Sequence, residues 1–132
     1  MPGVDTNAAI HVAAFRAALR AFLRESELSA RDGGLTPQRY LLLLMIKGAP
    51  DASERATVTD LAERLGLAQS TVTELVGRAE EIGLIERLPS DADGRVVYLQ
   101  LTHEGERRLA RAFTRLDDER ARLRDAFAEL EQ

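Results

Sequence analysis

Cysteine is absent from the 132-residue chain. Its absence excludes disulfides, zinc–thiolate sites, a cysteine nucleophile and redox sensing by thiols. Long apolar runs are absent too, since the longest, YLLLLMI from Tyr40 to Ile46, is too short to span a bilayer. The opening residues MPGVDTNAAIHVAAF contain no basic segment followed by an apolar core, so we expect no signal peptide. We therefore expect a cytoplasmic protein with no membrane partner and, at this length, one domain over 1–132.

The usual marks of catalysis are missing as well. No Ser-His-Asp arrangement, metal-ligand spacing or Gly-rich phosphate loop stands out, and GLAQSTVTELVG lacks the Gly-Lys pair of a phosphate-binding loop. We expect His11 and His103 to be structural or exposed rather than sensory. The sequence therefore predicts a protein that is not an enzyme and that uses no cofactor or metal.

Positive charge is scarce for a protein that would bind nucleic acid. The net charge is −4, and Lys47 is the only lysine among 18 basic residues. Phosphate contacts from basic side chains supply most non-specific affinity for nucleic acid. The acidic balance is therefore an objection to any DNA-binding function.

What the sequence does contain is a series of helical patterns. Residues 8–30 place apolar side chains at spacings of three and four and predict a helix that ends at the turn residues RDGG. Thr36 and Pro37 favour the start of a second helix, which Gly48 ends. Four consecutive leucines make this second helix apolar on nearly every side, so we expect it to be buried.

The next segment predicts two short helices around a tight turn. Thr59 is the expected cap of the first helix, and Gly66 can close it in a left-handed conformation. The second helix begins after a three-residue turn and ends at Gly83, and two short strands follow at 84–88 and 95–101. A helix–turn–helix followed by a β-hairpin describes a winged helix-turn-helix.

A last predicted helix starts after Thr102 and carries an apolar seam that includes one basic residue, Arg120. The apolar seam residues are Leu109, Phe113, Leu116, Leu123, Phe127 and Leu130. A small core cannot cover both amphipathic terminal helices, so we expect them to pair with a partner subunit. The predicted fold is mainly α with a small β-hairpin wing. A winged helix-turn-helix at 36–102 would lie between N-terminal (1–35) and C-terminal (103–132) dimerisation helices.

Three stretches resemble the MarR family of bacterial transcription regulators. LTPQRYLLLLMI resembles the family's second helix, and TVTDLAERLGLAQSTVTELVGRAEEIGLIER resembles its helix-turn-helix running into the wing. DADGRVVYLQLTHEG resembles its wing signature, an Asp-x-Arg at the tip followed by Leu-x-Leu-Thr and a later glycine. Here the signature residues are Asp93, Arg95, Leu99, Leu101, Thr102 and Gly105. Each stretch alone is a weak motif, but all three in this order are a strong resemblance over nearly the whole chain.

The resemblance implies a homodimeric repressor of transcription that binds a pseudo-palindromic operator in double-stranded DNA. A recognition helix would enter the major groove and the wing arginine the minor groove, and a small anionic or aromatic effector would release the protein from DNA. Two rival functions stay open. One is a winged helix that has become a protein-interaction module, and the other is a ligand sensor with little DNA affinity.

Three departures from the family pattern matter. Ala68-Gln69 stands where many members open the recognition helix with Ser-Pro, and because alanine cannot cap, roughly 1 kcal/mol of stabilisation is missing. Glu74 stands where relatives often carry a basic residue after Thr73. The chain ends near Gln132, so we expect the family's final helix to be absent.

Six residues are candidates for DNA contact. They are Gln69, Ser70, Thr71, Thr73, Arg78 and Arg95. Polar side chains in the first two turns of a recognition helix can read base edges or hold phosphates, although any amphipathic helix also presents polar residues to solvent. Arg78 could clamp a phosphate or form an i,i+4 pair with Glu74.

Arg95 has two interpretations as well. It could be a solvated turn arginine paired with Asp91 or Asp93. At a projecting hairpin tip it could instead enter a narrow minor groove, whose negative potential attracts arginine. Gly94 would then allow a close approach to the DNA backbone, and Asp93 would orient the guanidinium.

The charge objection is sharpest between Thr57 and Thr102, where eight acidic residues face four basic ones, a net of −4. The acidic residues are Asp60, Glu63, Glu74, Glu80, Glu81, Glu86, Asp91 and Asp93, and the basic ones are Arg64, Arg78, Arg87 and Arg95. We therefore expect weak, salt-sensitive DNA binding unless further arginines gather on the DNA side. The arginines in question are Arg39, Arg55, Arg64 and Arg87.

Arg16, Tyr40 and Arg120 are the candidate ligand-binding residues. Arg16 and Tyr40 could line a pocket between the dimerisation and DNA-binding regions, and Arg120 could pair with an anionic ligand. The alternative for Arg120 is a snorkelling side chain or a salt bridge at an interface.

Overall fold

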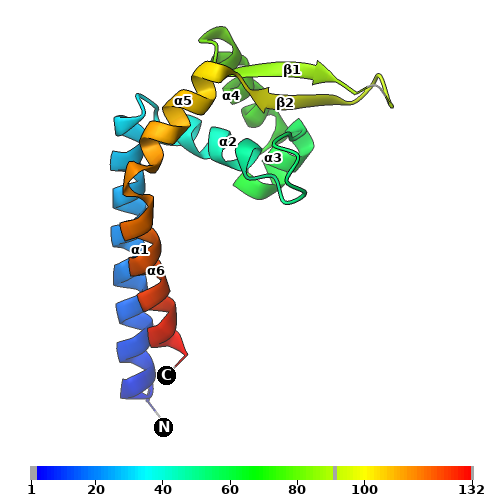
Figure 1. Ribbon diagram of the computed structural model, residues 1–132. Coiled ribbons are helices and arrows are strands. Elements are labelled where there is room, and N and C mark those ends of the chain that lie inside the picture. The colour runs from blue at the N-terminus through cyan, green and yellow to red at the C-terminus, as the bar shows by residue number, and fades with distance from the viewer. Residues whose placement is uncertain (1–2, 91, 132) are drawn as a thin grey trace.

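A lobe and a two-helix stalk make up the molecule (Figure 1). The computed structural model describes residues 3–90 and 92–131. Helix α1 (Thr6–Asp32) and helix α6 (Leu116–Leu130) lie side by side as the stalk, and both chain ends are at its far end. The lobe contains α2 (Pro37–Lys47), α3 (Val58–Leu65), α4 (Gln69–Glu81), β1 (Ile85–Pro89), β2 (Val97–Leu101) and α5 (His103–Ala112). The predicted fold class, mainly α with a β-hairpin wing, is confirmed.

Helix starts follow the capping residues. The Thr36 side chain accepts a hydrogen bond from the backbone N–H of Arg39 at 3.2 Å, as the sequence predicts for α2. For α3 the predicted cap, Thr59, is wrong. Thr57 is the cap, because its hydroxyl accepts from the Asp60 N–H while the Asp60 carboxylate accepts from the Thr57 N–H. This reciprocal pair satisfies two backbone donors, which Thr59, the second residue of the helix, cannot do.

Helix α2 is the centre of the core. Leu42, Leu43 and Ile46 are fully buried, and α3, α4, α5 and β2 all pack against α2. The sequence predicts that this helix is buried on nearly every side. That expectation holds only in part, since Leu41 is 40% exposed. The buried residues of α3 and α4 complete the core, with Gly66 between them in the left-handed conformation that the sequence predicts.

The hairpin extends away from the lobe as a wing (Figure 1). Its strands are antiparallel and pair Ile85 with Leu101 at the base and Pro89 with Val97 toward the tip. Ala56 adds a short bridge to Leu99, with hydrogen bonds of 3.1 and 2.8 Å in the two directions. This bridge fastens the loop before α3 to the wing, so the wing and the helix-turn-helix hold a fixed relation.

The C-terminal region corrects one expectation. It folds as two helices, α5 and α6, separated by the 3₁₀ turn Phe113–Arg115, and not as one continuous helix. The break moves the buried face: Glu119 and Ala126 are buried in α6, whereas Phe127 is 51% exposed. The side chain of Leu116, another predicted seam residue, lies outside the described side chains.

No helix within the described residues is long and apolar enough to cross a membrane.

Candidate nucleic-acid interface

Helix α4 presents a polar face to solvent. The helix buries Val72, Val76 and Ala79 on one side. The opposite side is exposed and includes the first residues of the helix. The predicted contact residues Gln69, Ser70, Thr71 and Thr73 are all exposed. Because i and i+4 positions share a helix face, Glu74 lies on the same exposed row as Ser70. The face therefore offers hydroxyl and amide groups together with one carboxylate.

The start of α4 lacks a side-chain cap, as the sequence predicts. Ala68 occupies the cap position and no side chain accepts a hydrogen bond there. The amide of Gln69 turns back toward α3, where its nitrogen donates to the Thr59 hydroxyl at 3.4 Å. The first turn of α4 therefore keeps backbone N–H groups available for an anionic group.

Arg78 forms the i,i+4 ion pair with Glu74, which is one of the two interpretations that the sequence left open. Its guanidinium lies 2.8 Å from the Glu74 carboxylate, and both side chains are more than 60% exposed (63% and 65%). A pair this exposed is weak, about 0.3–0.5 kcal/mol, so the pairing leaves Arg78 able to turn toward a phosphate.

Arg95 projects from the tip of the wing. Its backbone N–H donates to Asp93 Oδ1 at 3.0 Å, and its Nε lies 3.4 Å from the same oxygen. The side chain is nevertheless 92% exposed, the condition that insertion into a groove requires. Gly94 has no positive φ, so the turn itself does not require glycine there. Asp91, the other partner considered from the sequence, lies outside the described residues.

The wing tip and the start of α3 share a hollow of about 300 Å³. Thr57, Val58 and Thr59 line one side of it, and Arg95, Val96 and Val97 line the other. Sequence reasoning did not predict that the first turn of α3 would adjoin Arg95. The sequence pattern of Thr57 followed three residues later by Asp60, a capping box, could have predicted the start of α3 correctly. No sequence pattern predicts the bridge between Ala56 and Leu99.

The four further arginines that could have offset the acidic charge do not form one cluster. Arg64 donates to the carbonyl oxygens of Met45 and Gly48 at the end of α2, at 3.1 and 3.3 Å. Arg87 pairs with Glu80 at 3.0 Å. The Arg55 guanidinium lies 4.8 Å from the centre of the Tyr98 ring, on the wing. Arg55 is thus held against the wing, Arg87 lies in the wing strand β1, and Arg39 is half-buried in the first turn of α2.

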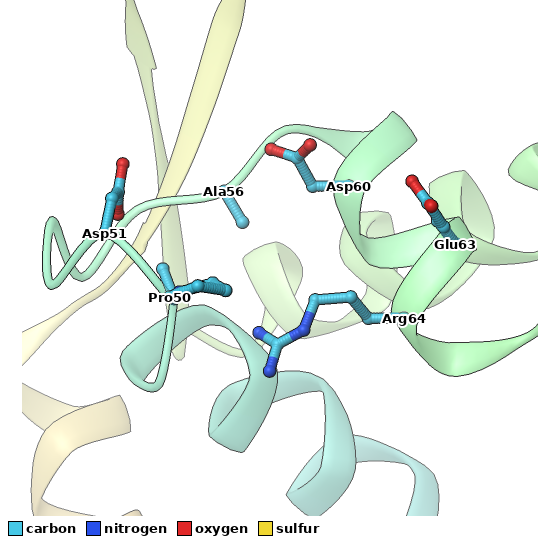
Figure 2. A pocket seen from close by; sticks show the side chains of 7 residues that line it. Pro50, Asp51, Ala56, Asp60, Glu63 and Arg64 are labelled. Atoms are coloured by element: carbon cyan, nitrogen blue, oxygen red, sulfur yellow. The ribbon is translucent and has the colours of Figure 1, made fainter.

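A second hollow, of about 420 Å³, lies between α3 and the loop that precedes it (Figure 2). Three carboxylates, of Asp51, Asp60 and Glu63, line it together with Arg64. Hydrogen bonds from the side chain and the backbone of Ser53 lower the pKa of Asp51, which keeps this carboxyl ionised. Within the described residues, no three such side chains are placed so that together they could hold a metal ion. The acidic lining makes this hollow unsuited to phosphates.

The three candidate ligand residues are not brought together. Tyr40 lines a hollow between α1 and α2 and is 4% exposed. Arg16 and Arg120 are both exposed, and neither lines that hollow. An anionic ligand at Tyr40 would therefore lack the arginine partner that the sequence suggested.

Comparison with known proteins gives concordant results. A sequence model described as MarR family matches residues 33–96, the segment from the end of α1 to the wing tip. The uncharacterized HTH-type transcriptional regulator YsmB of Bacillus subtilis (strain 168) is 33% identical over 93 residues, which are 70% of this chain and 59% of that protein. These matches support a winged-helix regulator of the MarR family.

Solved structures of transcriptional regulators share its fold. A mutant of MarR from E. coli, complexed with operator DNA, superposes with a TM-score of 0.69 at 22% identity, covering 88% of this chain and 84% of that one. The transcriptional regulator Tm0710 from Thermotoga maritima gives a TM-score of 0.62 at 28% identity, with coverages of 87% and 76%. The chain spans about three fifths of the length of YsmB.

Proposed function

We propose that the protein is a cytoplasmic, homodimeric, sequence-specific DNA-binding regulator of transcription, acting as a repressor and not as an enzyme. The observation that carries the proposal is Arg95. It is 92% exposed at the tip of a wing that is fastened to the helix-turn-helix by the bridge from Ala56 to Leu99. A solvated turn arginine needs no such support.

The geometry suggests how each element meets DNA. Helix α4 would lie in the major groove, where Gln69, Ser70 and Thr73 can hydrogen-bond to base edges or phosphates. Arg95 would enter the adjacent minor groove, with Asp93 holding its backbone N–H. The E. coli MarR mutant of the same fold was solved with operator DNA, which supports this arrangement for the present chain.

The stalk supports the homodimer. Val12 and Leu23 of α1 are 50% and 55% exposed, and Phe127 and Leu130 of α6 are 51% and 40% exposed. Large apolar side chains exposed along a helix pair indicate a protein interface. In this proposal the segment 36–102 binds DNA while 1–35 and 103–132 dimerise, so that two recognition helices can meet a pseudo-palindromic operator.

Electrophoretic mobility shift with the DNA upstream of the protein's own coding region tests the proposal. We expect specific retardation at low salt that weakens as salt rises. Arg95→Ala should weaken it by about 1–3 kcal/mol, or roughly 5- to 150-fold, because one deep groove contact per protomer is lost. Arg122→Ala, on the stalk, is the control and should leave retardation unchanged. Failure to retard any duplex at low salt would reject the DNA-binding function and favour a protein-interaction module.

Light scattering tests the dimer separately. We expect twice the mass of the 14.6 kDa chain at micromolar concentration. A monomer there would contradict the dimer even if some DNA affinity were found.

A further inference from the structure

Helix α4 carries a carboxylate on the face that the proposed function turns toward DNA. Glu74 is 65% exposed and lies one turn after Ser70 on the same row. Between Gln69 and Leu75 no other residue is charged. A carboxylate repels phosphates and so weakens binding to every DNA sequence. Its presence on this face therefore calls for a gain other than affinity.

The Glu74 carboxylate has one oxygen engaged and one available. Arg78 donates from Nη2 to Oε1 at 2.8 Å, and this i,i+4 pair runs in the favourable direction, with the acid nearer the helix start. No residue that the structure describes donates to the other oxygen, Oε2. Arg78 therefore offsets the charge of the carboxylate and holds it in place, while Oε2 stays available as a hydrogen-bond acceptor.

The helix surface beside Glu74 is open to a close approach. Gly77 is the i+3 neighbour of Glu74, and a Cβ at Gly77 would meet no described atom within 4 Å. Glycine weakens a helix interior, and nothing that packs against this position requires it. The missing side chain lets the wall of a DNA groove come close to α4 at the level of Glu74.

We propose that Glu74 selects cytosine in each half-site of the operator. Its Oε2 accepts a hydrogen bond from the N4 amino group of cytosine in the major groove. Guanine and thymine present acceptors and no donor at their major-groove edges, and adenine places the N7 acceptor next to its N6 amino group. Glu74 therefore discriminates chiefly by repulsion of the wrong bases. The inference rests on the proposed function, in which α4 lies in the major groove.

Selection of duplexes from a random-sequence pool by the protein at low salt identifies the bases that it prefers. We expect a cytosine in each half-site, bound about fivefold better than guanine or thymine, with adenine between them. For a symmetric operator changed to thymine in both half-sites, the loss should be about 25-fold, because the effects of separated positions add as free energies. Fluorescence anisotropy with the selected duplex and its single-base variants measures these ratios.

Glu74→Gln should change the preferred base, which loss of a merely structural residue would not do. The glutamine amide can still accept from cytosine and also matches N6 and N7 of adenine. We therefore expect adenine at this position to be bound at least as well as cytosine, with the preferences at other positions unchanged. Glu81→Gln removes the same charge from an exposed site about two turns further along α4 and should retain the cytosine preference. Equal loss of preference in both variants would mean that net charge alone acts, and would overturn the proposal.

Arg78→Ala separates base reading from charge. It should weaken binding to every duplex but keep the preference for cytosine, and loss of that preference would assign the reading to the arginine and overturn the role of Glu74. Selected duplexes in which no cytosine position responds to Glu74→Gln would overturn it as well. In both cases the protein still selects duplexes, so the proposed function stands. If the protein enriches no duplex at low salt, the regulator function itself is rejected, and this inference with it.

Discussion

Two glycines, Gly105 and Gly77, both lie within helices but have opposite surroundings. At Gly105 of α5, a Cβ would collide with the backbone carbonyl oxygen of Leu84. At Gly77 of α4, a Cβ would meet no atom within 4 Å. The glycine of the wing signature is therefore a packing requirement, because α5 approaches the chain segment before β1 closely enough to exclude any side chain.

This difference predicts stability changes of opposite sign. Gly105→Ala should lower the free energy of unfolding by about 1–3 kcal/mol, since a backbone atom cannot move aside as a flexible side chain can. Gly77→Ala should raise it by about 0.5–1 kcal/mol through the higher helix propensity of alanine. Urea unfolding followed by circular dichroism measures both. Equal changes in the two variants would contradict the close approach at Leu84.

At the scale of elements, the start of α3 tests the capping assignment. Thr57→Ala should cost about 1 kcal/mol, because it removes the acceptor for the Asp60 N–H and half of the capping box. Thr59→Ala, the residue favoured by sequence, should cost less than about 0.5 kcal/mol, since its recorded contact is the 3.4 Å hydrogen bond from Gln69. Thermal unfolding of both variants decides between them. A larger loss at Thr59 would restore the sequence-based start.

Short-range signals explain what the sequence predicted well. Thr36 and Thr102 cap their helices as expected, because the capping hydroxyl and the N–H it accepts from are only three residues apart. The α4 face and the wing also follow from local patterns. The predicted start of α3 was wrong by two residues, because Thr57 and Thr59 are both good capping residues. Only Asp60 distinguishes them, since it lies three residues after Thr57 and can complete a capping box with it.

Long-range packing explains what the sequence missed. Each residue of a 3₁₀ turn advances about 120°, against about 100° in an α-helix, so the three residues of the turn before α6 rotate the following face by about 60°. Repeat spacing cannot reveal such a shift, and Glu119 is buried where leucines were expected. The contact of the wing tip with the α3 start depends likewise on a bridge between residues 43 positions apart, Ala56 and Leu99.

For the whole molecule, electrostatics sets the strength of DNA binding. The chain carries a net charge of −4, and the arginines nearest to the proposed DNA face are held in different ways. Arg78 is paired with Glu74, Arg87 with Glu80, and Arg64 with carbonyl groups of α2. Affinity should therefore respond strongly to the removal of a single carboxylate on that face.

Glu74→Gln is the change that tests this balance. It removes a carboxylate from the α4 face and releases Arg78 to contact a phosphate, so we expect tighter operator binding. A dimer would gain two phosphate contacts, and at about 0.9 per phosphate the slope of log affinity against log salt should steepen by about 1.8. Fluorescence anisotropy of labelled operator between low and moderate salt measures this slope. Glu131→Gln, at the far end of the stalk, changes net charge equally and should leave the slope unaltered. An unchanged slope in Glu74→Gln would mean that Arg78 does not reach the DNA backbone.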